Sequence, residues 1–347
     1  MRQESNALYA TPPGHLSSIA IFSDLPARST SAFHRNTSTP ILLVPLAGAD
    51  YYAGRISVKP GAAAAGARPL EEPDMSQPTL PRVPFAGRQV SRMLLGGNPF
   101  SGFGHHPELP DFDRELLAYF TEEKILETMT LAVRNGINAF HGRGDEKVFR
   151  WLANYRAWAA SQPDRPELNW LAQTAPDRYP DGRVEPNIEA IAANQPMAIY
   201  IHGGTSDTFA DEGRVDELKR LVAYIKSLGF FAGLGSHRAS LIRLFEERDF
   251  GADFYILSLR DIPEEDRVCE DERAAALTIR EVPKTFVAIK VLAAGRLPVA
   301  EAFQYAARTL KPGDLMTVGM RDYEVATNVR LAAQAFADAG QGPSASN

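Results

Sequence analysis

Histidines form the most informative chemical pattern in this chain. The imidazole side chain exchanges protons near neutral pH more readily than any other, and five of the seven histidines lie between residues 105 and 237. They are His105, His106, His141, His202 and His237. Each lies at or just after a short run that is typical of a β-strand. Chance is a poor explanation for five such positions, so the pattern predicts a small-molecule site built from strand ends.

Lys290 adds a second kind of chemistry. In the β-rich run 285–292, Val287 and Ile289 suit a side that faces helices, and this alternation predicts that Ala288 and Lys290 point into the sheet's interior. A buried ammonium group is costly unless it is paired, and such lysines often take part in chemistry. Contact with a cofactor or substrate, Schiff-base formation, and a simple ion pair at the rim all stay open for Lys290.

The elements that must position these residues alternate between strand-like runs and segments with helical periodicity. Eight β-rich runs are separated by segments in which apolar residues recur at helical spacing, which is typical of repeated βα units and a parallel sheet. The runs are Met93–Leu95, Ile137–His141, Leu168–Thr174, Met197–His202, Phe230–Gly235, Asp253–Leu259, Thr285–Leu292 and Leu315–Gly319. The weakest helical segments are the third, near 187–193, and the sixth, near 270–280.

Eight units over about 245 residues match the size of a (β/α)8 TIM barrel. The alternative is an open doubly wound sheet, which needs a glycine-rich turn after its first strand, and the residues 96–99 lack that pattern. We therefore predict a barrel over residues 91–338. Because barrel chemistry is done at the carboxyl ends of the strands, the histidines are expected to share one rim.

The two ends of the chain have a different composition. Residues 1–80 contain proline, glycine and alanine clusters without helical or strand periodicity, so we expect a disordered or mis-assigned extension with a natural start near Met75. Residues 339–347 are expected to form a flexible tail. The sequence shows no secretion signal, and its one cysteine, Cys269, excludes a disulfide framework, so a cytoplasmic location is expected.

Charge and hydropathy limit the partners. The formal net charge is −6 and the isoelectric point is about 5.7, which argues against a general nucleic-acid binder. No apolar stretch reaches the roughly 18 residues of a membrane helix. A small molecule is therefore the expected partner, and the sequence does not fix the oligomeric state.

Several motifs, taken in order, resemble one enzyme family. They are Asn135–Phe140, Tyr200–His202, Phe231–His237, Val291–Leu297 and Val318–Asn328. Over about residues 92–337 the chain resembles the aldo-keto reductases, which are (β/α)8 oxidoreductases that use NADPH without a Rossmann fold. The resemblance implies NADP(H) as cofactor. It also implies cofactor contacts at Ser236, Gly295, Arg296, Gly319, Arg321, Glu324 and Asn328.

The catalytic positions depart from this family, whose tetrad is Asp, Tyr, Lys and His. His141 stands at the aspartate position, no tyrosine follows it, and the strand around Gln173 carries no lysine. Only His202 matches. Since carbonyl reduction needs an acid at the developing alkoxide, we expect His141, His202 or His237 to supply it as an imidazolium, with Lys290 as a further catalytic candidate.

Three functions stay open on the sequence alone. The first is an NADP(H)-linked oxidoreductase that acts on a small carbonyl or alcohol with histidine acid–base chemistry. The second is a divalent-metal lyase, isomerase or hydrolase, with His141, His202 and His237 as ligands beside Asp145 or Asp322. The third is a binding protein without catalytic activity.

Overall fold

Eight parallel strands close into a barrel in the computed structural model, which describes residues 78–106, 108, 109, 111–260 and 272–340. The strand order is β10-β3-β4-β5-β6-β7-β8-β9, so the first and last barrel strands pair and complete the ring. The strands are β3 (Met93–Gly96), β4 (Ala139–Arg143), β5 (Asn169–Gln173), β6 (Ala198–Ile201), β7 (Phe231–Ser236), β8 (Phe254–Ser258), β9 (Thr285–Ile289) and β10 (Leu315–Gly319). All eight predicted strands and the predicted (β/α)8 architecture are confirmed.

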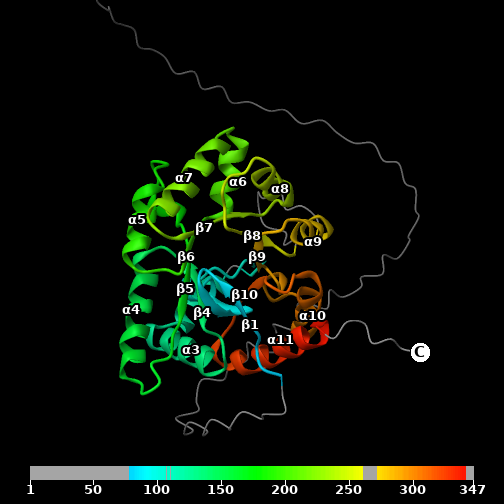
Figure 1. The fold of residues 1–347 in the computed structure, drawn as a ribbon. Helices are drawn as coiled ribbons and strands as arrows, with labels where there is room; N and C mark the ends of the chain where they lie inside the picture. The colour runs from blue at the N-terminus through cyan, green and yellow to red at the C-terminus, as the bar shows by residue number, and fades with distance from the viewer. Residues whose placement is uncertain (1–77, 107, 110, 261–271, 341–347) are drawn as a thin grey trace, which may run out of the picture. The chain divides into compact units, whose positions relative to one another are not determined.

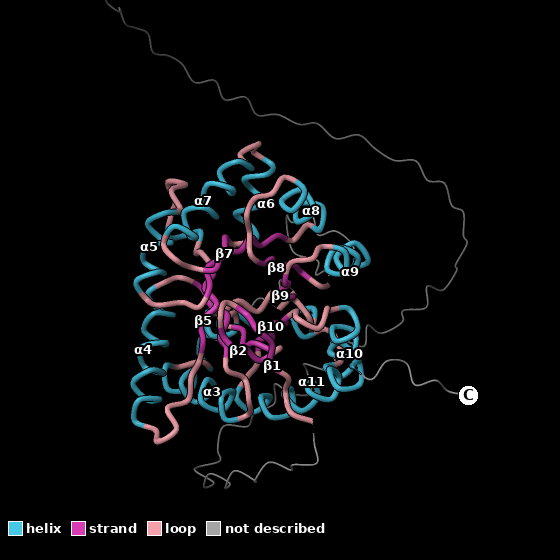
Figure 2. The backbone as a smooth tube through the Cα atoms, in the orientation of Figure 1, coloured by secondary structure: helices cyan, strands magenta, loops and turns pink. Residues whose placement is uncertain are grey.

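Helices surround this ring on the outside (Figures 1 and 2). They are α2 (Phe112–Tyr119), α3 (Glu122–Arg134), α4 (Glu146–Ser161), α5 (Glu185–Ala193), α6 (Gly203–Asp211), α7 (Val215–Ser227), α8 (Ala239–Glu247), α9 (Glu272–Glu281), α10 (Val299–Thr309) and α11 (Val325–Gly340). Each buries the side that carries its apolar residues, as Val148, Trp151 and Leu152 show on α4. The two weakest predicted helices exist as α5 and α9.

Two apolar clusters divide the core. The larger one lies between the strands and the helices and contains residues such as Phe140, Trp170 and Phe286. The smaller one fills the barrel interior and contains inward-facing strand residues such as Leu94, Ala139 and Val287. Since successive strand residues point to opposite faces, the same eight strands supply both clusters.

A short antiparallel hairpin, formed by β1 (Arg82–Phe85) and β2 (Arg88–Ser91), precedes the barrel. Ala86 and Gly87 form its two-residue turn with φ of 48° and 73°, which matches the turn that suits the twist of a hairpin. Phe85 packs edge-on against Phe231 and Phe254, with ring centroids 5.3 and 5.1 Å apart. The hairpin therefore fills the amino-terminal end of the barrel and leaves the carboxyl-terminal end for a site.

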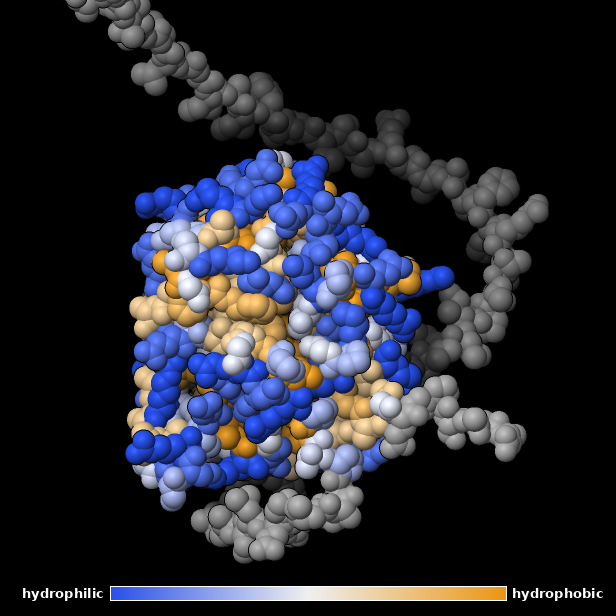
Figure 3. Space-filling view, viewed as in Figure 1, coloured by the Kyte–Doolittle hydropathy of each residue, from blue (hydrophilic) through white to orange (hydrophobic). Residues whose placement is uncertain are grey.

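This hairpin lies ahead of the range 91–338 that the sequence predicted for the barrel. Leu80, just before it, is also buried in the larger cluster. The rest of the predicted extension, residues 1–77, and most of the predicted tail lie outside the described residues. Among the described residues, no helix has the length and apolar character needed to cross a membrane. Figure 3 shows a largely hydrophilic face with apolar residues gathered toward the middle of the view.

Candidate active site

A cavity of about 700 Å³ lies at the carboxyl ends of the barrel strands. Residues that follow β3, β4, β6, β7, β9 and β10 line it, so it receives side chains from all around the ring. Its lining includes most of the predicted site residues: His141, His202, Ser236, His237, Lys290, Gly295, Gly319, Arg321, Glu324 and Asn328. His105 also lines it, whereas Arg296 and His106 do not. The structure therefore brings the predicted residues together at one rim.

His141 lies at the inner end of this cavity in a chain of hydrogen bonds between barrel strands. Its Nδ1 atom is 3.0 Å from Thr317 Oγ1 on β10, and its Nε2 atom is 2.7 Å from the Tyr200 hydroxyl on β6. Tyr200 in turn donates its hydroxyl hydrogen to Gln173 Oε1 on β5 at 2.6 Å. These contacts link strands on different sides of the ring.

The hydrogen-bond directions in this chain follow from the chemistry of the groups. Tyr200 has one hydroxyl hydrogen, and that hydrogen goes to Gln173. The Tyr200 oxygen must therefore accept from Nε2–H of His141, and Nδ1 of His141 accepts from the Thr317 hydroxyl. The arrangement uses both nitrogens of a neutral imidazole.

Burial keeps His141 neutral. It lowers the pKa of the imidazole to about 4, because a charged ring loses its hydration in the barrel interior. Burial also raises the pKa of the Tyr200 hydroxyl well above its usual value. The lowered pKa disfavours His141 as an imidazolium near neutral pH, since burial costs the charged ring its hydration, and its predicted role as a proton donor stays a prediction.

Unlike His141, whose partners are hydroxyl groups, His237 has a carboxylate as its partner. Directly after β7, its Nδ1 atom lies 2.7 Å from Asp207 Oδ2, and its backbone N–H donates to the same oxygen at 3.3 Å. The second carboxylate oxygen of Asp207 accepts from the Ser236 hydroxyl at 2.6 Å. Burial alone would raise the pKa of the Asp207 carboxyl, but the hydrogen bonds from His237 and Ser236 outweigh it and hold the pKa below its usual value.

Ser236 is therefore occupied within the protein. Besides donating to Asp207, its oxygen accepts from the backbone N–H of Arg238 at 2.9 Å. These contacts fix the turn that leads from β7 into α8. The predicted contact of Ser236 with a cofactor stays a prediction, and the structure assigns its hydroxyl a local partner.

His202 begins α6, the helix that carries Asp207. Its backbone N–H donates to Thr174 Oγ1 at 3.0 Å, and its carbonyl accepts from Ser206 N. The following residue, Gly203, lies so close to His237 that a β-carbon there would be 3.2 Å from His237 Cε1. His202, Asp207 and His237 are thus held by one short segment at the rim.

Lys290 reaches the cavity for a different reason from the one predicted. Val287 and Ile289 belong to the interior cluster and Ala288 to the outer cluster, so the predicted orientation of this strand is wrong by one residue. β9 ends at Ile289, and the backbone then turns with φ of 58° at Lys290, an uncommon conformation for a residue with a side chain. Lys290 lines the cavity from this turn rather than from the strand.

The loop after β9 is fastened to the loop after β3. Arg296 donates to Glu108 at 2.8 Å and to the carbonyl of His105 at 2.9 Å. His106 lies 2.8 Å from Glu108 through Nδ1 and 2.5 Å from the Ala294 carbonyl through Nε2. Arg296 therefore joins two loops in this structure, although the sequence predicted a cofactor contact.

The segment after β10 forms the other end of the cavity. Arg321 packs over the rings of Phe112 and Tyr119, and its guanidinium makes no ion pair with a described residue. Glu324 accepts from the Arg321 backbone N–H at 2.8 Å, which caps the turn that enters α11. Asn328 is buried, lines the cavity and makes no side-chain hydrogen bond to a described residue.

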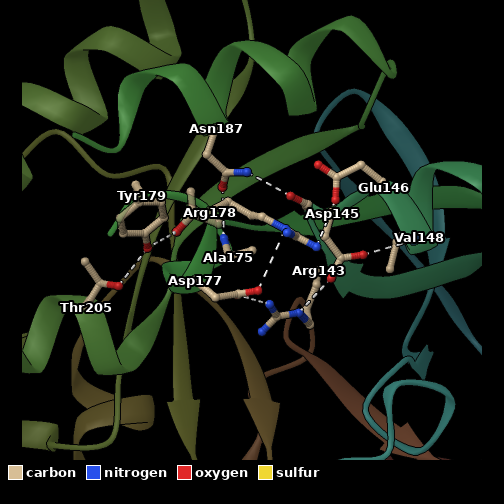
Figure 4. Close-up of polar contacts among 12 residues, drawn as sticks. Arg143, Asp145, Glu146, Val148, Ala175, Asp177, Arg178, Tyr179, Asn187 and Thr205 are labelled. Carbon is tan, nitrogen blue, oxygen red and sulfur yellow. Dashed lines mark hydrogen bonds and ion pairs between the residues drawn. The ribbon is translucent and has the colours of Figure 1, made fainter. Parts of the chain in front are cut away.

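Charged residues from the loops after β4 and β5 gather beside the cavity (Figure 4). Arg143 donates to Asp145 at 2.9 Å and pairs with Asp177, while Arg178 pairs with Glu146 at 2.9 Å. Burial alone would raise the pKa of the Asp177 carboxyl, but the Arg143 guanidinium outweighs it and holds the pKa below its usual value. Arg143 and Asp177 line the cavity, which thus has a charged border beside β4 and β5.

Sequence reasoning missed the partners of the histidines. Tyr200, Gln173 and Thr317 were not assigned roles, and Asp207 was not placed beside His237. Strand alternation could have pointed Tyr200 inward, because Ala198 two residues earlier lies in the interior cluster. No local pattern could have paired Asp207 with His237, since they lie 30 residues apart on different elements.

The predicted metal alternative lacks a ligand set in the part of the chain that the structure describes. No group of three or more His, Cys, Asp or Glu side chains is arranged there to hold a metal ion. His141 makes its contacts to two hydroxyl groups and His237 to Asp207, so two of the three histidines proposed as ligands are engaged elsewhere.

Comparison with known proteins gives a likeness in structure only. No protein-family profile and no curated protein matches the sequence. A protein from Pseudomonas aeruginosa assigned to the aldo-keto reductases superposes with a TM-score of 0.51 at 18% identity, covering 75% of this chain and 98% of its own. A second structure of an assigned aldo-keto reductase from that organism gives 0.50 at 19%, covering 74% and 97%. At this identity the likeness establishes the fold, and it agrees with the family that the sequence motifs resemble.

Proposed function

We propose that this protein is a nicotinamide-dependent oxidoreductase that acts on a small carbonyl or alcohol, with NADP(H) as its cofactor. The observation that carries the proposal is the cavity at the carboxyl-terminal mouth, which joins an acid–base end at His202 and His237 to an end that suits a nucleotide. A barrel needs no separate nucleotide-binding domain for this chemistry when both ends open into one cavity.

The residues at the Arg321 end fit a phosphorylated nucleotide. Arg321 offers a guanidinium without a described carboxylate partner, which suits a phosphate group. Asn328 offers a buried amide that lines the cavity and suits the edge of a base. A β-carbon at Gly319 would lie 2.8 Å from the Pro99 ring, so the backbone of Gly319 packs against Pro99 and leaves no space for a side chain there.

The cofactor, when bound, supplies or accepts the hydride. The protein's own part is then to bind the substrate and to move a proton at its oxygen. Burial disfavours His141 as an imidazolium, because it lowers the pKa of the ring to about 4. Proton transfer therefore falls to a histidine at the rim, His202 or His237, and the charged border at Arg143 and Asp177 orients the substrate.

Calorimetric titration with NADPH and NADH tests this proposal. We expect NADPH to bind, and Arg321→Ala to weaken NADPH about 10- to 100-fold while NADH barely changes, because a charge-assisted contact is worth roughly 1.5–3 kcal/mol. Arg330→Ala, an exposed arginine on α11, is the matched control and should leave both affinities unchanged. Absence of binding at millimolar NADPH contradicts the proposal and favours a different ligand or a non-catalytic protein.

A further inference from the structure

Of the histidines at the rim, His237 has the surroundings that acid–base chemistry needs. Asp207 receives the Nδ1 side of its ring at 2.7 Å, and an ionised carboxylate can only accept hydrogen bonds. The proton therefore stays on Nδ1, and the lone pair of the neutral ring lies on Nε2. In many catalytic histidines a carboxylate accepts the hydrogen of one ring nitrogen in this way and thereby orients the ring.

Asp207 itself is held in place from several sides. Its Oδ1 accepts from the Ser236 hydroxyl at 2.6 Å, and its Oδ2 also receives the His237 backbone N–H. Its backbone carbonyl accepts from the Arg238 guanidinium at 2.8 Å, and that guanidinium pairs with Asp211 at 2.7 Å. A carboxylate with this many partners cannot swing away, so the ring of His237 keeps one orientation.

We propose that Asp207 is a positioning residue that fixes the proton of His237 on Nδ1, and that His237 Nε2 exchanges the proton with the substrate oxygen. The hydride step rests on the proposed function. In the reducing direction the bound cofactor would supply the hydride of the new C–H bond, and the Nε2 proton of the His237 imidazolium would form the O–H bond. The ring is left neutral with its hydrogen on Nδ1, and cavity water restores the second proton.

The proposal separates His237 from His202, which holds the family-like position in the sequence. The Nδ1 of His237 has a carboxylate partner that comes from a different element, and the backbone of His202 holds the start of α6, the helix that supplies this carboxylate. Gly203 leaves room for the His237 ring, since a β-carbon at this position would lie 3.2 Å from His237 Cε1. The packing around His237 thus favours one ring position.

Two measurements on the full chain test the proposal together. NADPH oxidation is followed with 4-nitrobenzaldehyde as the carbonyl probe, and long-range 1H–15N NMR of the histidine side chains reports which ring nitrogen carries hydrogen. We expect Asp207→Asn to lower kcat about 100-fold with little change in KM or in NADPH affinity. We also expect it to move the His237 ring away from the Nδ1–H form. Asp207→Glu should recover part of both signals.

Asp216→Asn is the matched control, because it removes an exposed carboxylate from the next helix, α7, that is not among the described contacts of Asp207 or His237. It should leave kcat and the NMR signals unchanged. Unchanged kcat in Asp207→Asn, or loss of turnover in His202→Ala but not in His237→Gln, overturns the proposal. So does a wild-type His237 ring without hydrogen on Nδ1. Absence of NADPH binding contradicts the proposed function instead. The NMR result then still decides whether Asp207 positions His237.

Discussion

His141 and His237 line the same cavity but lie in two different regions of the barrel. His141 projects from a strand into the interior, where its partners are the hydroxyl groups of Thr317 and Tyr200. His237 lies on the turn after a strand, where its partner is the Asp207 carboxylate. The same residue type is thus kept neutral by one region and paired with a negative charge by the other.

The difference shows that the partner and the element, rather than the residue type, set what a histidine can do. Interior strands supply neutral groups, because an isolated charge there loses its hydration without compensation. Loops and helix starts at the rim can supply carboxylates that keep part of their hydration. His141 in the interior therefore suits a structural role, whereas His237 at the rim has the carboxylate partner on which its proposed role in proton transfer rests.

The largest expected effect concerns the pH dependence of stability. The folded-state pKa of His141 is lowered to about 4 from an ordinary value near 6.5, so the unfolded chain binds more protons between these values. The free energy of unfolding should therefore fall as the pH drops from 6.5 to 4, by up to about 3 kcal/mol from this group. Urea unfolding at several pH values measures this fall, and His141→Gln should flatten it. An equally steep fall in the variant contradicts the assignment.

A smaller effect is expected from Tyr200→Phe. The change leaves Nε2–H of His141 without its acceptor and Gln173 Oε1 without its donor inside the barrel, which should cost about 1–3 kcal/mol of unfolding free energy. The matched control is Tyr255→Phe, which removes a hydroxyl that bonds Glu246 on the helix side. That control should cost no more than about 1 kcal/mol. Equal losses of unfolding free energy in the two variants would show that the hydrogen bonds of Tyr200 stabilise the fold no more than that of Tyr255 does.

The smallest expected effect on stability comes from Gly203→Ala. The new methyl group meets the His237 ring at a separation tighter than ordinary contact, so the ring must move by a few tenths of an ångström. We expect the free energy of unfolding, measured by thermal unfolding, to fall by about 1 kcal/mol or less. Turnover should fall several-fold, because a small displacement of an acid–base group slows proton transfer. Gly313→Ala, where a β-carbon has open space, is the control for both measurements.

The sequence predicted the strands better than it predicted their surroundings. β-Rich runs and helical spacing are local signals, which is why all eight strands and most helices were found. α6 was missed because it begins with Gly203 and Gly204, which are poor helix formers that only tertiary packing stabilises. With α6 missed, Asp207 could not be placed beside His237.

The orientation of β9 shows a second limit. Alternation predicted Val287 and Ile289 on the helix side and Lys290 inside the barrel. Val287 and Ile289 face the interior instead, β9 ends at Ile289, and the backbone then turns to positive φ at Lys290. Periodicity cannot show where a strand stops, and a shift of one residue reverses every side chain. The hairpin before residue 91 was missed for a related reason, since its two strands of four residues are too short to show a period.

The most direct test of the difference between His141 in the interior and His237 at the rim is a single long-range 1H–15N NMR spectrum of the wild-type protein at neutral pH. It should show which ring nitrogens of these two buried histidines carry hydrogen, with the signals assigned by His141→Gln and His237→Gln. His141 should carry hydrogen on Nε2, because its Nδ1 accepts from Thr317, and His237 should carry hydrogen on Nδ1, because Asp207 accepts it. If both rings carry hydrogen on the same nitrogen, or if His141 is an imidazolium, the division between interior and rim is wrong.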